Sequence, residues 1–172
     1  MISRKTWMAM IFGLTVIGAD FLSKFLVNTH IPLVFSYSSF PYGGVAIFED
    51  LGGISCSLVH SINKGAAWGI LSNYQELLVF FRIGLVSLLF IYVYIYKKDC
   101  SYYLPFAFIL AGAFGNILDY FVYGHVVDMV FFQFWGYGYP VFNLADSAIT
   151  LGGFFLLISY YFKKGGRLKD EG

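Results

Sequence analysis

The sequence predicts an all-α membrane protein with four transmembrane helices. Of its 172 residues, 59% are hydrophobic and 12% are charged, whereas soluble domains carry about 25% charged residues. Four apolar stretches are long enough to cross a hydrocarbon core, which takes about 20 helical residues. The basic residues gather at the ends of these stretches in a way that gives all spans one consistent orientation. These observations predict a single membrane-embedded domain over residues 1–172.

The four predicted transmembrane helices cover residues 6–27, 77–96, 102–121 and 144–162. The first follows Arg4 and Lys5, as the apolar part of a secretory signal peptide follows basic residues. Asp20 and Lys24 interrupt its far end, so we expect a helix that is retained. The polar residues 165–172 are expected to be a disordered tail.

Three groups of basic residues orient these helices. They lie before the first helix, between the second and third, and after the fourth, and consist of Arg4, Lys5, Lys97, Lys98, Lys163, Lys164, Arg167 and Lys169. Four spans place all three groups on one side of the membrane, which the positive-inside rule identifies as the cytoplasm. Both termini are therefore predicted to be cytoplasmic.

Two long connections then lie outside, at residues 28–76 and 122–142. The first combines proline and glycine with β-branched and aromatic residues, a mixture that favours short strands over a helix. It carries few charged residues, so we expect it to rest on the membrane surface. The second contains the largely aromatic run 131–135, which suits the membrane interface.

Two aspartates at the outer side are the leading candidates for chemistry. Asp128 lies between Val127 and Met129, and a carboxylate amid apolar residues near lipid is costly enough to need a functional reason. Asp146 follows Asn143 by three residues at the expected start of the fourth helix, where the helix dipole favours an anion. The same spacing also fits a capping box, which is purely structural. Two close carboxylates can share one proton and carry out acid–base chemistry.

Other polar residues are candidates for supporting this pair. Asp20 and Lys24 are spaced to form an ion pair on one helix face, for which we favour a structural or supporting role. Asn116 and Asp119 form a polar face near the outer end of the third helix, where such groups hydrogen-bond across helices.

The segment before the second helix contains Asn63 and Gly65. Glycine there permits a positive φ or a close approach by another chain. Asn63 could bind a substrate backbone or cap a turn, and the sequence does not decide between these roles.

Metal, cofactor and nucleic-acid binding are not expected. His30, His60 and His125 form no ligand motif. The net charge of +1 gives no basis for binding nucleic acid.

Five short motifs together resemble a known family, the bacterial lipoprotein signal peptidases, also called signal peptidase II. Each motif is weak alone, but the ordered set is specific and covers most of the chain. The matching pieces are Asp20 with Lys24, the segment 63–69 (NKGAAWG), the segment 112–116 (GAFGN) with Asp119, Gly124 with 126–128 (VVD), and the segment 142–147 (FNLADS).

This resemblance implies an aspartyl endopeptidase of the cytoplasmic (inner) membrane with its active site on the outer face. It implies four transmembrane helices, a small extracytoplasmic β-cradle and a short periplasmic helix. The substrate would be a prolipoprotein with a diacylglyceryl-modified cysteine, cut just before that cysteine, and globomycin would inhibit. We expect membrane lipid as a further partner, a monomer, and no cofactor. The resemblance implies Asp128 and Asp146 as the catalytic pair, supported by Asn63, Asn116, Asp119 and Asn143.

The chain departs from the family pattern at three points. Tyr120 stands where the family usually has an arginine after the acid, and Met129 stands where phenylalanine is common. The connection 28–61 is longer than in many members.

Two other functions are open to such a sequence. Intramembrane acids also serve proton relays, so a proton-coupled carrier is one alternative, although two acids near one face do not make a path through the full depth. A non-enzymatic scaffold, whose polar residues only join helices, is the other.

Overall fold

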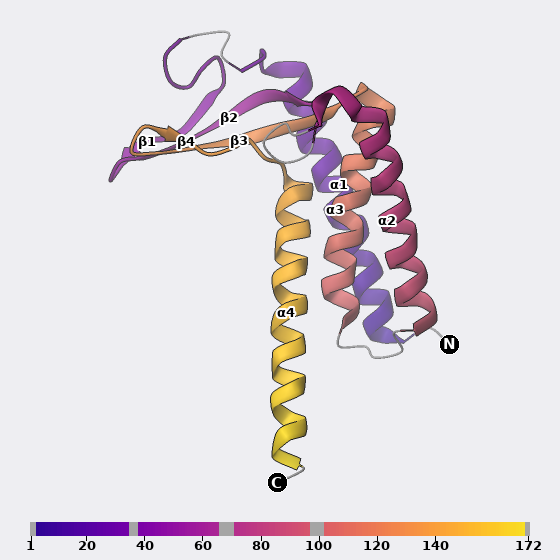
Figure 1. The fold of residues 1–172 in the computed structure, drawn as a ribbon. Coiled ribbons are helices and arrows are strands. Elements are labelled where there is room, and N and C mark those ends of the chain that lie inside the picture. The colour runs from indigo at the N-terminus through magenta and orange to yellow at the C-terminus, as the bar shows by residue number, and fades with distance from the viewer. Residues whose placement is uncertain (1–2, 35–37, 66–70, 97–101, 171–172) are drawn as a thin grey trace.

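The computed structural model describes residues 3–34, 38–65, 71–96 and 102–170, in which four helices carry a small sheet at one end (Figure 1). The third helix packs against all three others. In these residues, four helices are long and apolar enough to cross a membrane, as predicted. The helices are α1 (Arg4–His30), α2 (Gln75–Tyr96), α3 (Tyr103–Tyr123) and α4 (Leu144–Asp170), and a short 3-10 helix, η2 (Ser72–Tyr74), precedes α2.

A four-stranded antiparallel sheet accompanies the helices, so the all-α prediction was imprecise. Its order is β1 (Val45–Leu51), β2 (Ile54–Asn63), β3 (Val126–Phe134) and β4 (Tyr137–Gly138). Strands were expected in the first outer connection, but β3 and β4 come from the second. The pairing of β2 with β3 was not predicted. It provides hydrogen-bond partners for backbone N–H and C=O groups of both connections.

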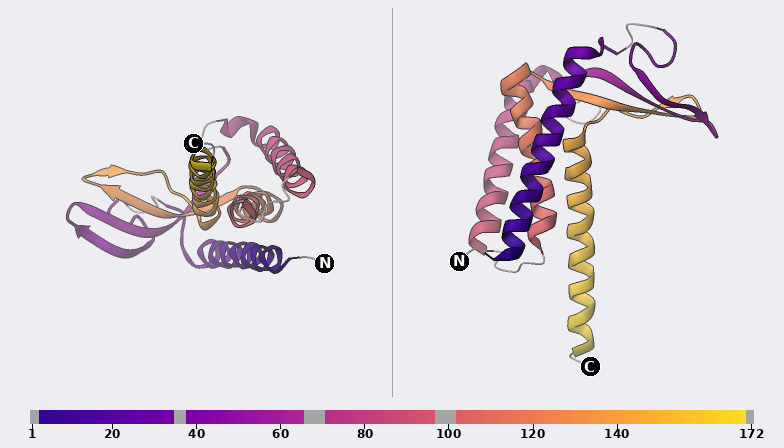
Figure 2. Two further views of the ribbon diagram at one scale, coloured as in Figure 1. Left: turned by 90° about the horizontal axis from the view of Figure 1, so that it is seen from below. Right: turned by 180° about the vertical axis from the view of Figure 1, so that it is seen from behind.

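The sheet extends sideways from the end of the bundle that lies away from both chain ends (Figures 1 and 2). Gly124 ends α3 with φ at 76° and turns the chain into β3, a backbone conformation that glycine adopts without strain. The first half of β3 is buried, and its Val127 and Met129 pack against Val27 near the end of α1. Because Asp128 lies between Val127 and Met129 in the sequence, this packing holds it close to the end of α1.

Helix α4 is longer than predicted. It continues to Asp170, through residues 165–170 of the segment that was predicted to be a disordered tail. Once a helix has formed, each further residue adds a hydrogen bond without a new nucleation cost. This propagation carries α4 through Gly165 and Gly166.

Two adjacent glycines of α4 give a matched test of helix packing. A Cβ on Gly152 would lie 2.8 Å from the carbonyl oxygen of Pro105 in α3, whereas a Cβ on Gly153 would meet nothing within 4 Å. We expect Gly152→Ala to lower the free energy of unfolding by about 1–3 kcal/mol through overpacking. Gly153→Ala should raise it by about 0.5–1 kcal/mol, because alanine loses less backbone entropy in a helix. Thermal unfolding of the two variants in detergent measures the difference, and equal effects would contradict the packing.

Candidate active site

The two candidate acids meet where β3 enters the sheet and α4 begins. Asp128 lies on β3 and is 2% exposed, while Asp146 lies in the first turn of α4 and is half-buried. Asp128 thus sits deeper in the protein than Asp146. Their surroundings differ, which is what separates the proton affinities of two neighbouring carboxyl groups.

Asn143, which is fully buried, joins the two acids. Its Nδ2 donates a 2.7 Å hydrogen bond to Oδ1 of Asp128. Its backbone N–H donates to Oδ2 of Asp146 at 3.2 Å, and Asp146 N–H donates back to Asn143 Oδ1 at 2.8 Å. The capping interaction foreseen as a structural alternative is therefore present. It coexists with a second role, because the same asparagine also holds Asp128.

A second asparagine, Asn116 of α3, lies beneath this pair. Its Nδ2 donates to Oδ1 of Asp146 at 2.8 Å. Its Oδ1 accepts from Asn143 Nδ2 at 3.1 Å and from Lys24 Nζ at 3.1 Å. Asn116 therefore connects the two acids to the charged layer below.

That layer consists of Lys24, Asp20 and Asp119, each at most 1% exposed. The Lys24 ammonium lies 2.7 Å from Oδ2 of Asp20 and 2.7 Å from Oδ2 of Asp119. Together with Asn116, these contacts engage all three N–H donors of the ammonium. The predicted ion pair of Asp20 and Lys24 is present, with a second carboxylate that sequence spacing alone did not pair with Lys24.

The two carboxylates of this layer also hold the backbone beside each candidate acid. Asp20 Oδ1 accepts a 2.8 Å hydrogen bond from the N–H of Ala145, the residue before Asp146. Asp119 Oδ2 accepts a 3.2 Å hydrogen bond from the N–H of Val127, the residue before Asp128. The charged layer thus fixes the positions from which both acids project.

Asn63, at the end of β2, contacts Asp128 from the other side. Its Nδ2 donates to Oδ2 of Asp128 at 2.9 Å, while its Oδ1 accepts from the N–H of Gly65 at 2.9 Å. Asn63 therefore caps a turn, one of the two roles left open by the sequence, and also binds the Asp128 carboxyl, whereas binding of a substrate backbone stays a prediction. Each oxygen of Asp128 receives one side-chain amide donor.

The pKa of Asp128 is strongly perturbed. Burial, and after it the charge of the nearby Asp146 carboxylate, raise the pKa of Asp128 from 3.8 to about 7, although hydrogen bonds from Asn63 and Asn143 oppose the rise. A carboxyl group whose pKa is raised this far can hold a proton at neutral pH. The pair can therefore carry one proton between two oxygen-bearing side chains.

The contacts bring together the whole set of residues that the sequence singled out: Asp20, Lys24, Asn63, Gly65, Asn116, Asp119, Asp128, Asn143 and Asp146. Arg82 of α2 was not predicted to belong to this set. Its Nη2 donates a hydrogen bond to the carbonyl oxygen of Gly65 at 2.8 Å. A cation inside an apolar span was the available signal.

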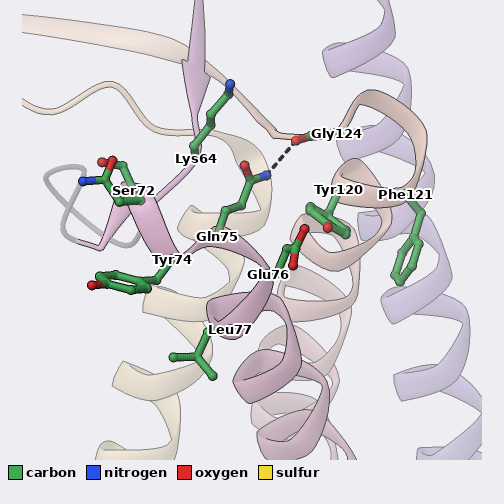
Figure 3. Close-up of a pocket in the computed structure, with 10 residues that line it drawn as sticks. Lys64, Ser72, Tyr74, Gln75, Glu76, Leu77, Tyr120, Phe121 and Gly124 are labelled. Atoms are coloured by element: carbon green, nitrogen blue, oxygen red, sulfur yellow. Dashed lines mark hydrogen bonds between the residues drawn. The ribbon is translucent and has the colours of Figure 1, made fainter.

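Tyr120, one of the departures from the family pattern, lines a cleft at the ends of α2 and α3 that lie nearest the sheet (Figure 3). The cleft has a volume of about 730 Å³, and Lys64 and Glu76 also line it. Gln75 closes one side through a 2.6 Å hydrogen bond to the carbonyl oxygen of Gly124.

Comparison with known proteins places the chain in a family. A family model described as signal peptidase (SPase) II matches residues 12–162. The chain belongs to the signal peptidase II family. A lipoprotein signal peptidase of Staphylococcus aureus is 30% identical over 155 residues, which cover 88% of this chain and 86% of that protein. One from Chlamydia pneumoniae is 38% identical over 113 residues, 64% of this chain and 67% of that protein.

Solved structures agree with this placement. A bacterial membrane enzyme determined by the in meso method at 2.3 Å resolution has a TM-score of 0.75 and 25% identity, over 92% of this chain and 90% of that chain. A second, at 1.9 Å resolution, has a TM-score of 0.70 and 26% identity, over 89% of this chain and 92% of that chain. The resemblance to signal peptidase II is confirmed, and the chain is an aspartic protease of the cytoplasmic membrane with several spans.

Proposed function

We propose that Asp128 and Asp146 are the catalytic pair of this signal peptidase II. Their reaction removes the signal peptide from diacylglyceryl-modified prolipoproteins, with the cut just before the lipid-modified cysteine, as is the role of the family. The observation that carries the assignment is the position of Asn143, which hydrogen-bonds both carboxyl groups. An acid buried with a neighbouring acid and two amide donors is arranged for proton transfer.

In the proposed mechanism, ionised Asp146 takes a proton from a water molecule whose oxygen attacks the scissile carbonyl carbon. Protonated Asp128 donates a hydrogen bond to the carbonyl oxygen and stabilises the negative charge that develops there. The carbon–nitrogen bond then breaks, and the cysteine nitrogen leaves with a proton from the pair. Asp146 lies half-exposed in the first turn of α4, so a water molecule can reach its carboxyl group.

The remaining polar residues have supporting roles on this proposal. Asn143 and Asn116 hold the two carboxyl groups at fixed positions, and Asn63 holds Asp128 from the opposite side. Asp20, Lys24 and Asp119 set the backbone from which the acids project. None of these groups needs to change charge during turnover, so they can act as a rigid frame.

We further propose that the chain is one membrane-embedded peptidase domain, active as a monomer, with both termini in the cytoplasm and the acids at the outer face. The sheet then serves as the extracytoplasmic β-cradle. The short periplasmic helix that the family resemblance implies stays a prediction; residues 66–70, which precede η2, lie outside the described part. The basic clusters at the chain's two ends support this orientation, because both ends lie on the side away from the sheet (Figure 1).

The lipid on the substrate should control cleavage. Each buried methylene of an acyl chain contributes about 0.8 kcal/mol to membrane binding, so a diacylglyceryl group holds the cysteine at the depth of the acids. We expect purified protein to cleave a diacylglyceryl-modified prolipoprotein, observed as a gel shift, and to leave the unmodified form uncut. Globomycin should block the reaction. Equal cleavage of the two forms would contradict the proposed presentation by lipid.

The pH dependence of cleavage should report the proton on Asp128. Because Asp128 must be protonated in this mechanism, the rate should fall as pH rises through about 7. Asn63→Ala removes a donor that stabilises the ionised form, which raises the pKa of Asp128 and moves this decline to higher pH. Asn28→Ala, at the end of α1, serves as the matched control. Initial rates at substrate concentrations well below KM, which report kcat/KM and hence the free enzyme, between about pH 5 and pH 9 measure the shift, and an unmoved profile in Asn63→Ala would argue against Asp128 as the acid.

A further inference from the structure

Arg82 is a cation placed inside an apolar membrane-spanning segment. It lies about two turns after Gln75, the first residue of α2, and within the apolar span Ser72–Val93. A charged side chain at such a position is costly and points to a specific partner. Its partner is the carbonyl oxygen of Gly65, which accepts from Nη2 at 2.8 Å. The long arginine side chain thus reaches from the membrane helix to the segment that carries Asn63.

Beyond Asn63, this segment is no longer hydrogen-bonded to a neighbouring strand. The pairing of β2 with β3 ends with Asn63 opposite Val126, so Gly65 lies beyond the described strand pairing. Gly65 is nevertheless buried. The hydrogen bond from Arg82 therefore fixes a residue that strand pairing does not hold.

Gly65 in turn sets the orientation of the Asn63 amide. The Gly65 N–H donates to Asn63 Oδ1 at 2.9 Å, which leaves the Nδ2 group to donate to Asp128 Oδ2 at 2.9 Å. An amide rotated by half a turn would present its oxygen to the carboxylate and repel the ionised form. The position of Gly65 thus decides whether Asn63 is a donor to Asp128.

We propose that Arg82 is a positioning residue for the catalytic pair, which holds Gly65 so that Asn63 presents an N–H group to Asp128. The proposal rests on the proposed function of Asp128. Arg82 acts through two intervening residues rather than on substrate. A lysine at this position keeps a donor but lacks the planar arrangement of several N–H groups.

A double-mutant cycle between Arg82 and Asn63 tests the proposal. Arg82→Met and Asn63→Ala should each lower the limiting rate on the acidic side of the pH profile by about tenfold, because the Asp128 carboxyl is no longer held in its reactive position. Each should move the alkaline decline of the pH profile in the same direction, to higher pH. Because both changes break the same chain of contacts, the double variant should behave like Asn63→Ala alone. Arg82→Lys should show a smaller effect, and Arg4→Met, at the opposite end of the bundle, should show none.

Additive losses in the double variant, or a slower Arg82→Met enzyme with an unmoved pH profile, would overturn the proposal. Should Arg82→Met not accumulate as folded protein, the same cycle is run with Arg82→Lys, where non-additivity with Asn63→Ala is again required. Failure of the proposed function is distinguishable, because it appears as full cleavage by Asp128→Asn. If Asp128→Asn abolishes cleavage but Arg82→Met leaves the pH profile unchanged, only the positioning role of Arg82 is removed and the proposed function stands.

Discussion

Replacement of either Asp128 or Asp146 by asparagine is expected to abolish cleavage of a lipid-modified prolipoprotein. An amide cannot take a proton from water or lend one to a carbonyl, and loss of a positioned acid or base costs about 10²–10⁴-fold in rate. Because the two carboxyl groups act as a unit, the double variant should be no slower than either single one. Purified variants assayed with the lipidated substrate measure the loss.

Asp50→Asn is the matched control for this experiment. Asp50 is an exposed aspartate near the β1–β2 turn whose Oδ1 accepts from the N–H of Gly53. Its φ is 50°, a conformation that asparagine also tolerates, so the same acid-to-amide change leaves the turn intact. Wild-type turnover by Asp50→Asn is expected. Substantial turnover by Asp128→Asn or Asp146→Asn would remove that residue from the catalytic pair.

The sequence was sufficient to predict the four spans and the candidate acids. Long apolar runs and clustered lysines reflect the constraints of a bilayer directly, so span number and basic clusters could be read from the chain. Asp128 and Asp146 stood out because carboxylates near lipid are costly. These features depend on local composition, which a single sequence records.

The contacts that hold the acids could not be predicted in this way. Asp20 binds the backbone N–H of Ala145, and backbone groups are the same at every position, so no residue type signals the pairing. Strand β3 was missed because its residues 126–129 are all buried, so their sequence shows no alternation of apolar and polar positions by which a half-buried strand is recognised. Both features arise only when distant segments meet.

Removal of the Lys24 charge should destabilise the protein more than the Gly152→Ala substitution does. Lys24→Met leaves Asp20 and Asp119, each 1% exposed, without their shared cation. Loss of one partner from a buried ion pair costs about 3–5 kcal/mol, because the other partner stays buried and unpaired. The residues before both acids would lose their fixed positions with it. Thermal unfolding in detergent measures the loss, with Lys5→Met, an exposed lysine of α1, as the control.

The origin of that loss can be separated from a mere loss of packing. If unpaired carboxylates cause it, then adding Asp20→Asn and Asp119→Asn to Lys24→Met should recover part of the stability, since the amides still accept hydrogen bonds from Ala145 and Val127 but carry no charge. If the methionine simply fits poorly, the triple variant should be no more stable than Lys24→Met. Recovery of folding without recovery of full activity is the expected result, because Asn116 would still lack the ammonium that holds its oxygen.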